Sequence, residues 1–156
     1  MLLIAAYPCL GKTTIASQNK EKIFDREFCE SRSRLGMNQS KNLKFVRACC
    51  DIIQMQYEAN YYNTMFITED EEIIEELDKR GIRPVLVFPN AFNDEHMIEY
   101  KESVIKRSGK AWWDRVLAGE IKGLKERINK YRDLGYDVRL TYPQKPYISD
   151  VVDLEI

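Results

Sequence analysis

Five short apolar runs, separated by longer polar segments, dominate the hydrophobic pattern of this chain. Continuous apolar runs of about four to eight residues are typical of strands that are covered on both faces of a sheet. The predicted strands are residues 2–6, 22–24, 64–68, 84–88 and 136–142. The second of them ends at Asp25, and Pro89 stops the fourth. Such runs predict a sheet that is buried between layers of helices.

Apolar residues recur at helical spacing between these runs, for example at Leu43, Val46, Cys50 and Ile53. The first two predicted helices cover residues 13–18 and run from a cap at Ser40 as far as Tyr57. A third runs from the cap Asp70 to Gly81. A fourth runs from Asn93 to an interruption at residues 108–111, and a fifth runs from there to Gly135. Residues 26–42 are polar and rich in Arg and Ser, which predicts a loop or irregular helix. Strands that alternate with helices imply an α/β three-layer sandwich with a mostly parallel five-stranded sheet.

Composition narrows the class of protein further. The chain has 156 residues, of which 44% are hydrophobic and 31% charged, and these values fit one domain with its own core. A formal net charge of -1 excludes a globally basic nucleic-acid-binding protein, although a local basic patch survives this average. No apolar run approaches the roughly 18 residues of a membrane span. The four cysteines form no Cys-x-x-Cys pair, so we expect reduced thiols in a cytoplasmic protein.

The first predicted strand leads directly into a phosphate-binding pattern. Residues 6–13 match the Walker A motif, with Ala6 in place of the usual first glycine. In such a loop successive backbone N–H groups point at phosphate oxygens, and Gly11 lets the backbone approach them. Lys12 is expected to be a mobile, solvent-reachable charge for the β- and γ-phosphates, and the Thr13 hydroxyl to hold Mg²⁺. The predicted nucleotide-binding residues are Pro8, Cys9, Leu10, Gly11, Lys12, Thr13 and Thr14.

With this loop in place, the chain resembles the P-loop kinases of the nucleoside monophosphate kinase group. More narrowly, it is similar to small kinase-like proteins encoded by bacteriophages. The features that carry the resemblance, in order, are residues 6–14, Asp25, Glu30-Ser31, residues 85–89, Glu99-Tyr100, residues 106–109, Trp112-Trp113 and residues 147–150. The resemblance implies one P-loop kinase-like domain over residues 1–156, with a lid around residues 94–115. It also implies ATP and Mg²⁺ as cofactors and ATP-dependent phosphoryl transfer, but it leaves the acceptor open.

Phosphoryl transfer needs positive charge on the oxygens of the transferred group, and a basic segment opposite the P-loop would supply it. The basic residues of the predicted lid are Lys101, Lys106, Arg107, Lys110 and Arg115. We expect Arg107 to be the first catalytic contact and Arg115 the second. The alternative is a solvated basic helix face that Glu99 and Glu102 balance.

Acidic residues follow two of the predicted strands. Asp25 lies where ligands bind in open parallel sheets, so it could orient an acceptor hydroxyl or hold Mg²⁺ through water. The alternative for Asp25 is an ion pair with Arg26. Arginines that follow Glu30 and Ser31 could clamp an acceptor phosphate or belong to a surface loop. Two acidic residues follow the third strand: we expect Asp70 to be a helix cap, whereas Glu69 stays open as the acidic Walker B residue.

Aromatic and histidine side chains are expected to play smaller parts. One ring of the Trp112-Trp113 pair should pack in the core and the other should lie near the lid, where stacking on a base is an alternative. His96 is expected on the surface in the first turn of its helix. The tyrosines 57, 61 and 62 are expected to pack, with the lining of an acceptor cleft as the alternative.

The sequence therefore predicts a kinase that moves the γ-phosphoryl group of ATP·Mg to a small acceptor, with a (deoxy)nucleoside monophosphate favoured. The alternatives are transfer to a non-nucleotide metabolite or to a nucleic-acid 5′-hydroxyl, and nucleotide binding without turnover. Among partners, we expect neither a membrane nor a nucleic acid, and a monomer or homodimer.

Overall fold

The computed structural model describes residues 1–26 and 43–154 and contains a five-stranded sheet in which every strand pair is parallel. The strand order is β2-β3-β1-β4-β5. The strands are β1 (Leu2–Ala6), β2 (Ile23–Arg26), β3 (Thr64–Thr68), β4 (Val85–Pro89) and β5 (Val138–Thr141). β1 is therefore the central strand, and its carboxyl end lies between those of β3 and β4. The predicted α/β class with a mainly parallel sheet is confirmed.

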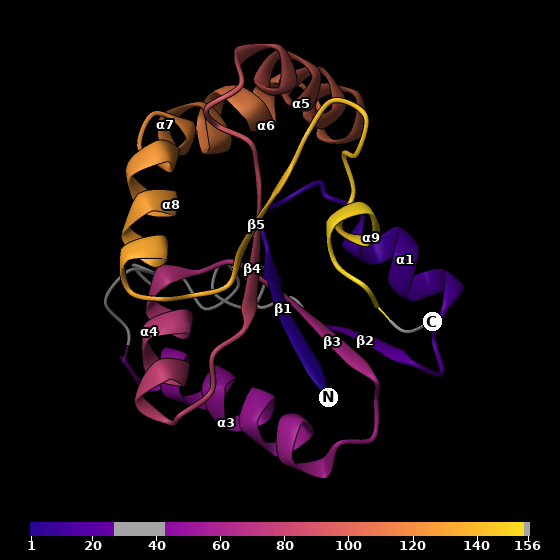
Figure 1. Cartoon of the computed structure of the whole chain (residues 1–156), viewed down its shortest axis with the longest axis vertical. Helices are drawn as coiled ribbons and strands as arrows, with labels where there is room; N and C mark the ends of the chain where they lie inside the picture. The colour runs from indigo at the N-terminus through magenta and orange to yellow at the C-terminus, as the bar shows by residue number, and fades with distance from the viewer. Residues whose placement is uncertain (27–42, 155–156) are drawn as a thin grey trace.

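Helices cover both faces of the sheet, as Figure 1 shows. They are α1 (Lys12–Gln18), α3 (Leu43–Ala59), α4 (Glu71–Lys79), α5 (Asp94–Ser108), α6 (Lys110–Trp112), the π-helix η2 (Trp113–Leu117), α7 (Ala118–Ile121), α8 (Leu124–Asp133) and α9 (Ile148–Val151). α4 and α8 lie on one side of the sheet and α1 and α9 on the other, while α5 and α6 cross above the carboxyl ends of the strands (Figure 1). The chain thus turns to opposite faces after β1 and after β4, and a parallel sheet opens a ligand crevice at such a point.

The core is built from the three middle strands, whose side chains are covered on both faces. Ile4 in β1, Phe66 in β3 and Leu86 in β4 have no exposed surface. Leu77 of α4 and Ile128 of α8 are equally buried and seal one face. The continuous apolar runs in the sequence thus correspond to strands inside the sheet, as the hydrophobic pattern predicts.

The segment between β4 and β5 differs from the single long helix that the sequence predicts. The interruption at residues 108–111 is confirmed, because α5 ends at Ser108 and α6 begins at Lys110. Beyond it the helix widens into η2 and then breaks at Gly123, whose N–H donates to the Glu120 carbonyl oxygen at 3.1 Å. A bond to the third residue back tightens the turn, and glycine is a poor helix former, so α8 starts anew.

Three strands also differ from the prediction in their bounds. β4 covers Val85–Pro89 rather than residues 84–88, because Pro89 still pairs with Thr141 of β5. β2 continues through Asp25 to Arg26, because both residues pair with β3. β5 is shorter than predicted and covers only Val138–Thr141. None of the helices in the described ranges is both long and apolar enough to cross a membrane.

Candidate functional site

The loop between β1 and α1 has the backbone geometry that a phosphate cradle requires. Cys9 has a φ of 65° and Gly11 a φ of 93°, so both residues adopt the left-handed region. Left-handed residues beside right-handed ones turn successive N–H groups toward one concave side. The backbone therefore favours glycine at position 11, and a Cβ atom there would lie 3.2 Å from Cδ1 of Tyr147 and displace the tyrosine ring slightly.

Distant parts of the chain hold this loop in place. The Tyr100 hydroxyl of α5 donates to the Pro8 carbonyl oxygen at 2.7 Å, although 92 positions separate the two residues. The N–H of Ile148, at the start of α9, donates to the Leu10 carbonyl oxygen at 3.1 Å. Both bonds anchor carbonyl oxygens of the loop and so fix its path between α5 and α9.

Lys12 and Thr13 each reach a neighbouring strand. The Lys12 ammonium donates to the Thr68 hydroxyl at 2.9 Å, and Thr68 is the last residue of β3. Only 4% of Lys12 is exposed, so the expectation of a solvent-reachable side chain is wrong: the strand end beside the loop covers it. The Thr13 hydroxyl donates to Oδ2 of Asp25 at 3.3 Å, which brings the two predicted metal ligands together.

Two cavities flank the loop. The larger, of about 940 Å³, lies between the loop, α1, α5 and the segment that follows β5. Its lining residues include Gly11, Thr14, His96, Glu99, Lys106, Arg107, Pro143, Pro146 and Tyr147. The smaller, of about 200 Å³, is lined by Pro8, Cys9, Lys12, Thr13, Thr68, Arg107, Ser108 and Trp112. Cys9, Thr13 and Arg107 line both cavities, so the two spaces meet over the loop.

The two arginines predicted as catalytic contacts differ in their placement. Arg107, in the last turn of α5, lines both cavities. Arg115 lines neither, and its Nε donates to the Ala111 carbonyl oxygen of the preceding α6 at 3.4 Å. Lys101 also lies away from the loop, with its ammonium 5.6 Å from the centre of the Trp113 ring. The structure therefore brings only part of the basic lid segment to the site.

The tryptophan pair divides as predicted. Trp113 is buried, whereas Trp112 lines the smaller cavity beside Arg107. The expectation for His96 is wrong. His96 is only 2% exposed rather than on the surface, because it shares one face of α5 with Tyr100 and Val104. Its Nε2 lies 2.9 Å from the Thr141 hydroxyl, and burial lowers the pKa of the imidazole, against an opposing effect of Glu99.

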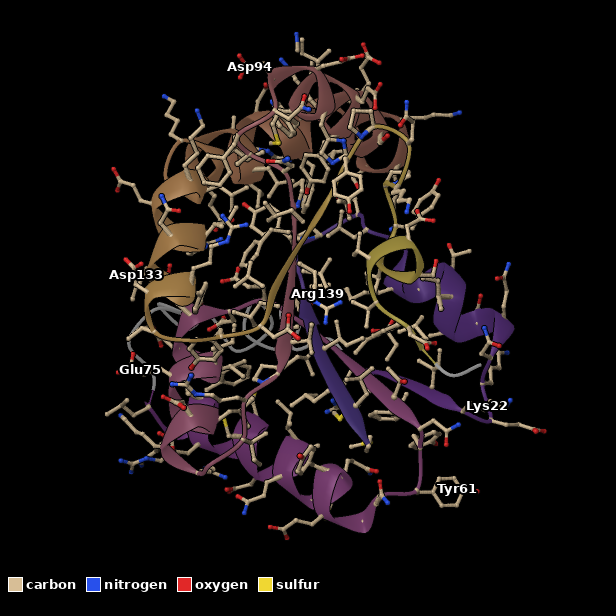
Figure 2. The ribbon with its side chains drawn as sticks, viewed as in Figure 1. Lys22, Tyr61, Glu75, Asp94, Asp133 and Arg139 are labelled. Atoms are coloured by element: carbon tan, nitrogen blue, oxygen red, sulfur yellow. The ribbon has the colours of Figure 1, made fainter. Side chains whose placement is uncertain are left out.

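Two of the three tyrosines that were expected to pack, Tyr57 in α3 and Tyr61 just after it, are more exposed than predicted. Tyr61 is 77% exposed and points away from the molecule, as Figure 2 shows, and Tyr57 is 38% exposed. Tyr62 stacks on Phe24 of β2 with ring centroids 5.2 Å apart, so it packs as expected. None of these three tyrosines lines either of the two cavities at the loop.

The two acidic residues after β3 have separate roles. Asp70 caps α4 as predicted, because its Oδ1 accepts from the N–H groups of Glu72 and Ile73. Glu69 turns away from the loop toward α8. Its Oε2 lies 3.0 Å from Nη2 of Arg127, and its Oε1 accepts from the Tyr131 hydroxyl at 3.0 Å.

Glu69 therefore faces α8 and lines neither cavity, and its Walker B role stays a prediction. Asp25 is the carboxylate that the structure brings to Thr13. No three His, Cys, Asp or Glu side chains gather as metal ligands anywhere in residues 1–26 and 43–154. Thr13 and Asp25 nonetheless offer the hard oxygen donors that Mg²⁺ prefers, and Mg²⁺ usually takes its other ligands from phosphates and water.

Several residues of the site carry no clear signal in the sequence. Pro143 and Pro146 follow the last strand, and only the sheet topology brings them to the cavity beside Gly11. Tyr147 belongs to residues 147–150, which carry the resemblance, but its place against Gly11 was not predicted. Thr68 has no motif of its own, although it ends the strand next to β1. The arginines predicted to clamp an acceptor phosphate are Arg32 and Arg34, and they lie outside the described residues together with Glu30 and Ser31.

Comparisons with known proteins add little to this geometry. No protein-family model and no curated protein matches the chain. Among solved structures, the crystal structure of APE1195 aligns with 99% of this chain and 87% of its own chain, at 15% sequence identity and a TM-score of 0.38. A similarity of this size carries no conclusion about fold or function, so the functional interpretation depends on the site itself.

Proposed function

We propose that this protein is a P-loop phosphotransferase, a kinase that moves the γ-phosphoryl group of ATP·Mg to a small acceptor. The observation that carries the proposal is the pair of cavities that meet over the loop at Cys9, Thr13 and Arg107. A kinase must hold two substrates with the transferred phosphoryl group between them, and this arrangement provides one space for each.

The larger cavity is the better site for the phosphoryl donor. Its volume of about 940 Å³ is at the upper end of the range for small-molecule sites. Pro143, Pro146 and Tyr147 give one wall an apolar surface against which a base can pack. The loop and Arg107 give the other end the N–H groups and the positive charge that a polyphosphate needs.

Magnesium would bind beside the loop. Thr13 lines both cavities and Asp25 lines neither, but their oxygens lie 3.3 Å apart, so both residues would hold the ion. When bound, Mg²⁺ supplies charge that neutralises the phosphate oxygens. The Lys12 ammonium contacts the Thr68 hydroxyl next to the loop and would bind the phosphates as a second positive charge.

The smaller cavity suits an acceptor that carries negative charge. Two cations, Lys12 and Arg107, line it, and no carboxylate does. Trp112 adds an aromatic surface that fits a planar ring. This combination favours a nucleoside monophosphate, whose phosphate would lie between the two cations. The cavity has a volume of about 200 Å³, so we expect the phosphate end of the acceptor to occupy it. Such an enzyme would work in the cytoplasm, where ATP and nucleotides are available.

Arg107 is the group that would act on both substrates. Because it lines both cavities, its guanidinium can contact the phosphoryl group during transfer. A cation placed where charge develops stabilises the transition state more than either bound substrate. Arg107 stands at the end of α5, directly before the break at Gly109, where a small backbone change would move it.

One observation favours a second candidate, nucleotide binding without turnover. The strand next to β1 ends in Thr68, and the carboxylate of Glu69 is engaged with α8. Asp25, which contacts Thr13, would then have to serve both as the metal ligand and as the group that orients the acceptor hydroxyl. A protein of this kind would bind ATP tightly but release no ADP.

A coupled assay of ADP release separates these possibilities. The purified protein is given Mg·ATP and a panel of acceptors: ribo- and deoxynucleoside monophosphates, nucleosides, sugars and an oligonucleotide with a 5′-hydroxyl. We expect ADP release with one or more nucleoside monophosphates and none with the K12A variant. Release only with sugars or the oligonucleotide would replace the acceptor class. ATP binding without release on any acceptor would favour the second candidate.

A further inference from the structure

A buried polar cluster lies behind the phosphate-binding loop, and the proposed transfer makes no use of it. At its centre, Glu69 forms an ion pair with Arg127 and accepts the Tyr131 hydroxyl, both at 3.0 Å. Glu69 is only 8% exposed, and Tyr131 only 3%. An ion pair that is removed from water to this extent is costly to form, so its position beside the loop calls for an explanation.

The cluster is joined to the loop at its root. The backbone N–H of Glu69 donates to the carbonyl oxygen of Ala6, the last residue of β1, at 3.1 Å. The Arg127 guanidinium lies 5.5 Å from the centre of the Tyr7 ring, and the Tyr7 hydroxyl donates to Glu120 of α7 at 3.3 Å. The first residues of the loop are therefore held from both α7 and α8.

The cluster is also joined to Lys12. Thr68, which accepts the Lys12 ammonium at 2.9 Å, directly precedes Glu69 in the chain. A displacement of the Glu69 backbone would carry Thr68 with it, and so the hydroxyl that Lys12 contacts. The position of Lys12 is therefore connected to Glu69 through one residue of β3.

We propose that Glu69 is a positioning residue for phosphate binding: its ion pair with Arg127 holds the end of β3, and so Lys12 and the root of the loop, in the place that binds a triphosphate. This inference rests on the proposed function and goes beyond it, because it assigns the control of the phosphate site to a contact outside both cavities.

The cluster makes this control depend on pH. Burial raises the pKa of Glu69 to about 7, Glu71 and Asp70 add to the rise, and Arg127 and the Tyr131 hydroxyl oppose it. Those four residues are the charged and titratable groups that face Glu69, with Tyr7 and Glu120 one contact further away. Above a pH of about 7 the carboxylate is charged and pairs with Arg127. Below it the carboxyl is neutral, and the guanidinium keeps the longer contacts to Glu71 at 3.5 Å and to the centre of the Tyr7 ring at 5.5 Å.

The test compares Mg·ATP binding by the wild type and by E69Q between about pH 6 and pH 8. Glutamine keeps an oxygen for the Tyr131 hydroxyl but removes the charge that Arg127 requires. The ratio of the two dissociation constants cancels the titration of ATP itself. We expect E69Q to bind roughly tenfold more weakly at pH 8, the scale of a lost charged contact, and nearly as well as the wild type at pH 6. A ratio that stays constant over this range would overturn the proposal.

Two further variants complete the test. D137N, which breaks an exposed pair with Arg139 of similar length, is the matched control and should bind as the wild type does at every pH. Y131F keeps the ring but removes a hydrogen bond that lowers the pKa of Glu69, so the midpoint of the wild-type profile should move to higher pH. An unmoved midpoint in Y131F contradicts the proposal even if E69Q does not fold. Failure of the wild type to bind Mg·ATP at any pH would instead remove the proposed function.

Discussion

The substitution G11A tests the geometry of the phosphate-binding loop. Gly11 has a φ of 93°, and an alanine in this left-handed region costs about 1–2 kcal/mol. Its Cβ would also lie 3.2 Å from Cδ1 of Tyr147, so the tyrosine ring has to move by a few tenths of an ångström. We expect G11A to lower the free energy of unfolding by about 2 kcal/mol, or the Tm by about 4–8 °C.

The functional effect of G11A should exceed its effect on stability. Because Tyr147 lines the larger cavity and Gly11 lies in the loop, the added methyl group disturbs both the base wall and the phosphate cradle. We expect Mg·ATP binding to weaken at least about tenfold, as measured by calorimetry on the folded variant at 25 °C.

Gly81 provides the matched control for this prediction. Its φ is 76°, and a Cβ there meets nothing within 4 Å, so G81A carries the backbone cost without the contact. We expect G81A to lose about 1–2 kcal/mol of stability and to bind Mg·ATP as the wild type does. If G11A bound Mg·ATP as tightly as G81A, the assignment of this loop as a phosphate cradle would be refuted.

Three further predictions follow from the placement of single side chains. R107A should lower kcat about a hundredfold in the assay of ADP release, whereas R115A should change it less than about twofold; equal losses would contradict the placement of Arg107 between the cavities. D70A should lose about 1 kcal/mol in urea unfolding because two N–H groups of α4 lose their acceptor, and an unchanged midpoint would rule out the cap. The pKa of Glu69 is higher in the folded state than in the unfolded state, so the folded state binds the proton more tightly. The free energy of unfolding should therefore fall as the pH rises from about 4.5 to 7. E69Q should remove this pH dependence, and a dependence that persists in E69Q would show that another group causes it.

The structural features that depend only on neighbouring residues were predicted from the sequence. The apolar run before Lys12 and the glycine before it indicate a strand, a tight turn and a helix, and the structure contains all three. Asp70 stands directly before an amphipathic helix, so its capping role follows from position alone.

Long-range contacts decided what the sequence left open. Glu69 and Tyr131 are 62 positions apart, and only the packing of α8 against the sheet reveals that the carboxylate is engaged there. Arg107 and Arg115 look alike in the sequence, but the break at Gly109 and the π-helix η2 send the second one away from the loop. His96 was within reach of the sequence, since His96, Tyr100 and Val104 recur every four residues on one buried face.

The proposed function depends on the binding of a magnesium-bound triphosphate by the loop between β1 and α1. Isothermal titration calorimetry with Mg·ATP, on the wild type and on K12A, tests it most directly. We expect saturable binding at one site in the wild type and binding at least about tenfold weaker in K12A. Circular dichroism should show that both proteins are folded. A wild-type protein that gives no binding heat with Mg·ATP or with magnesium tripolyphosphate over a range of temperatures would contradict the proposed function.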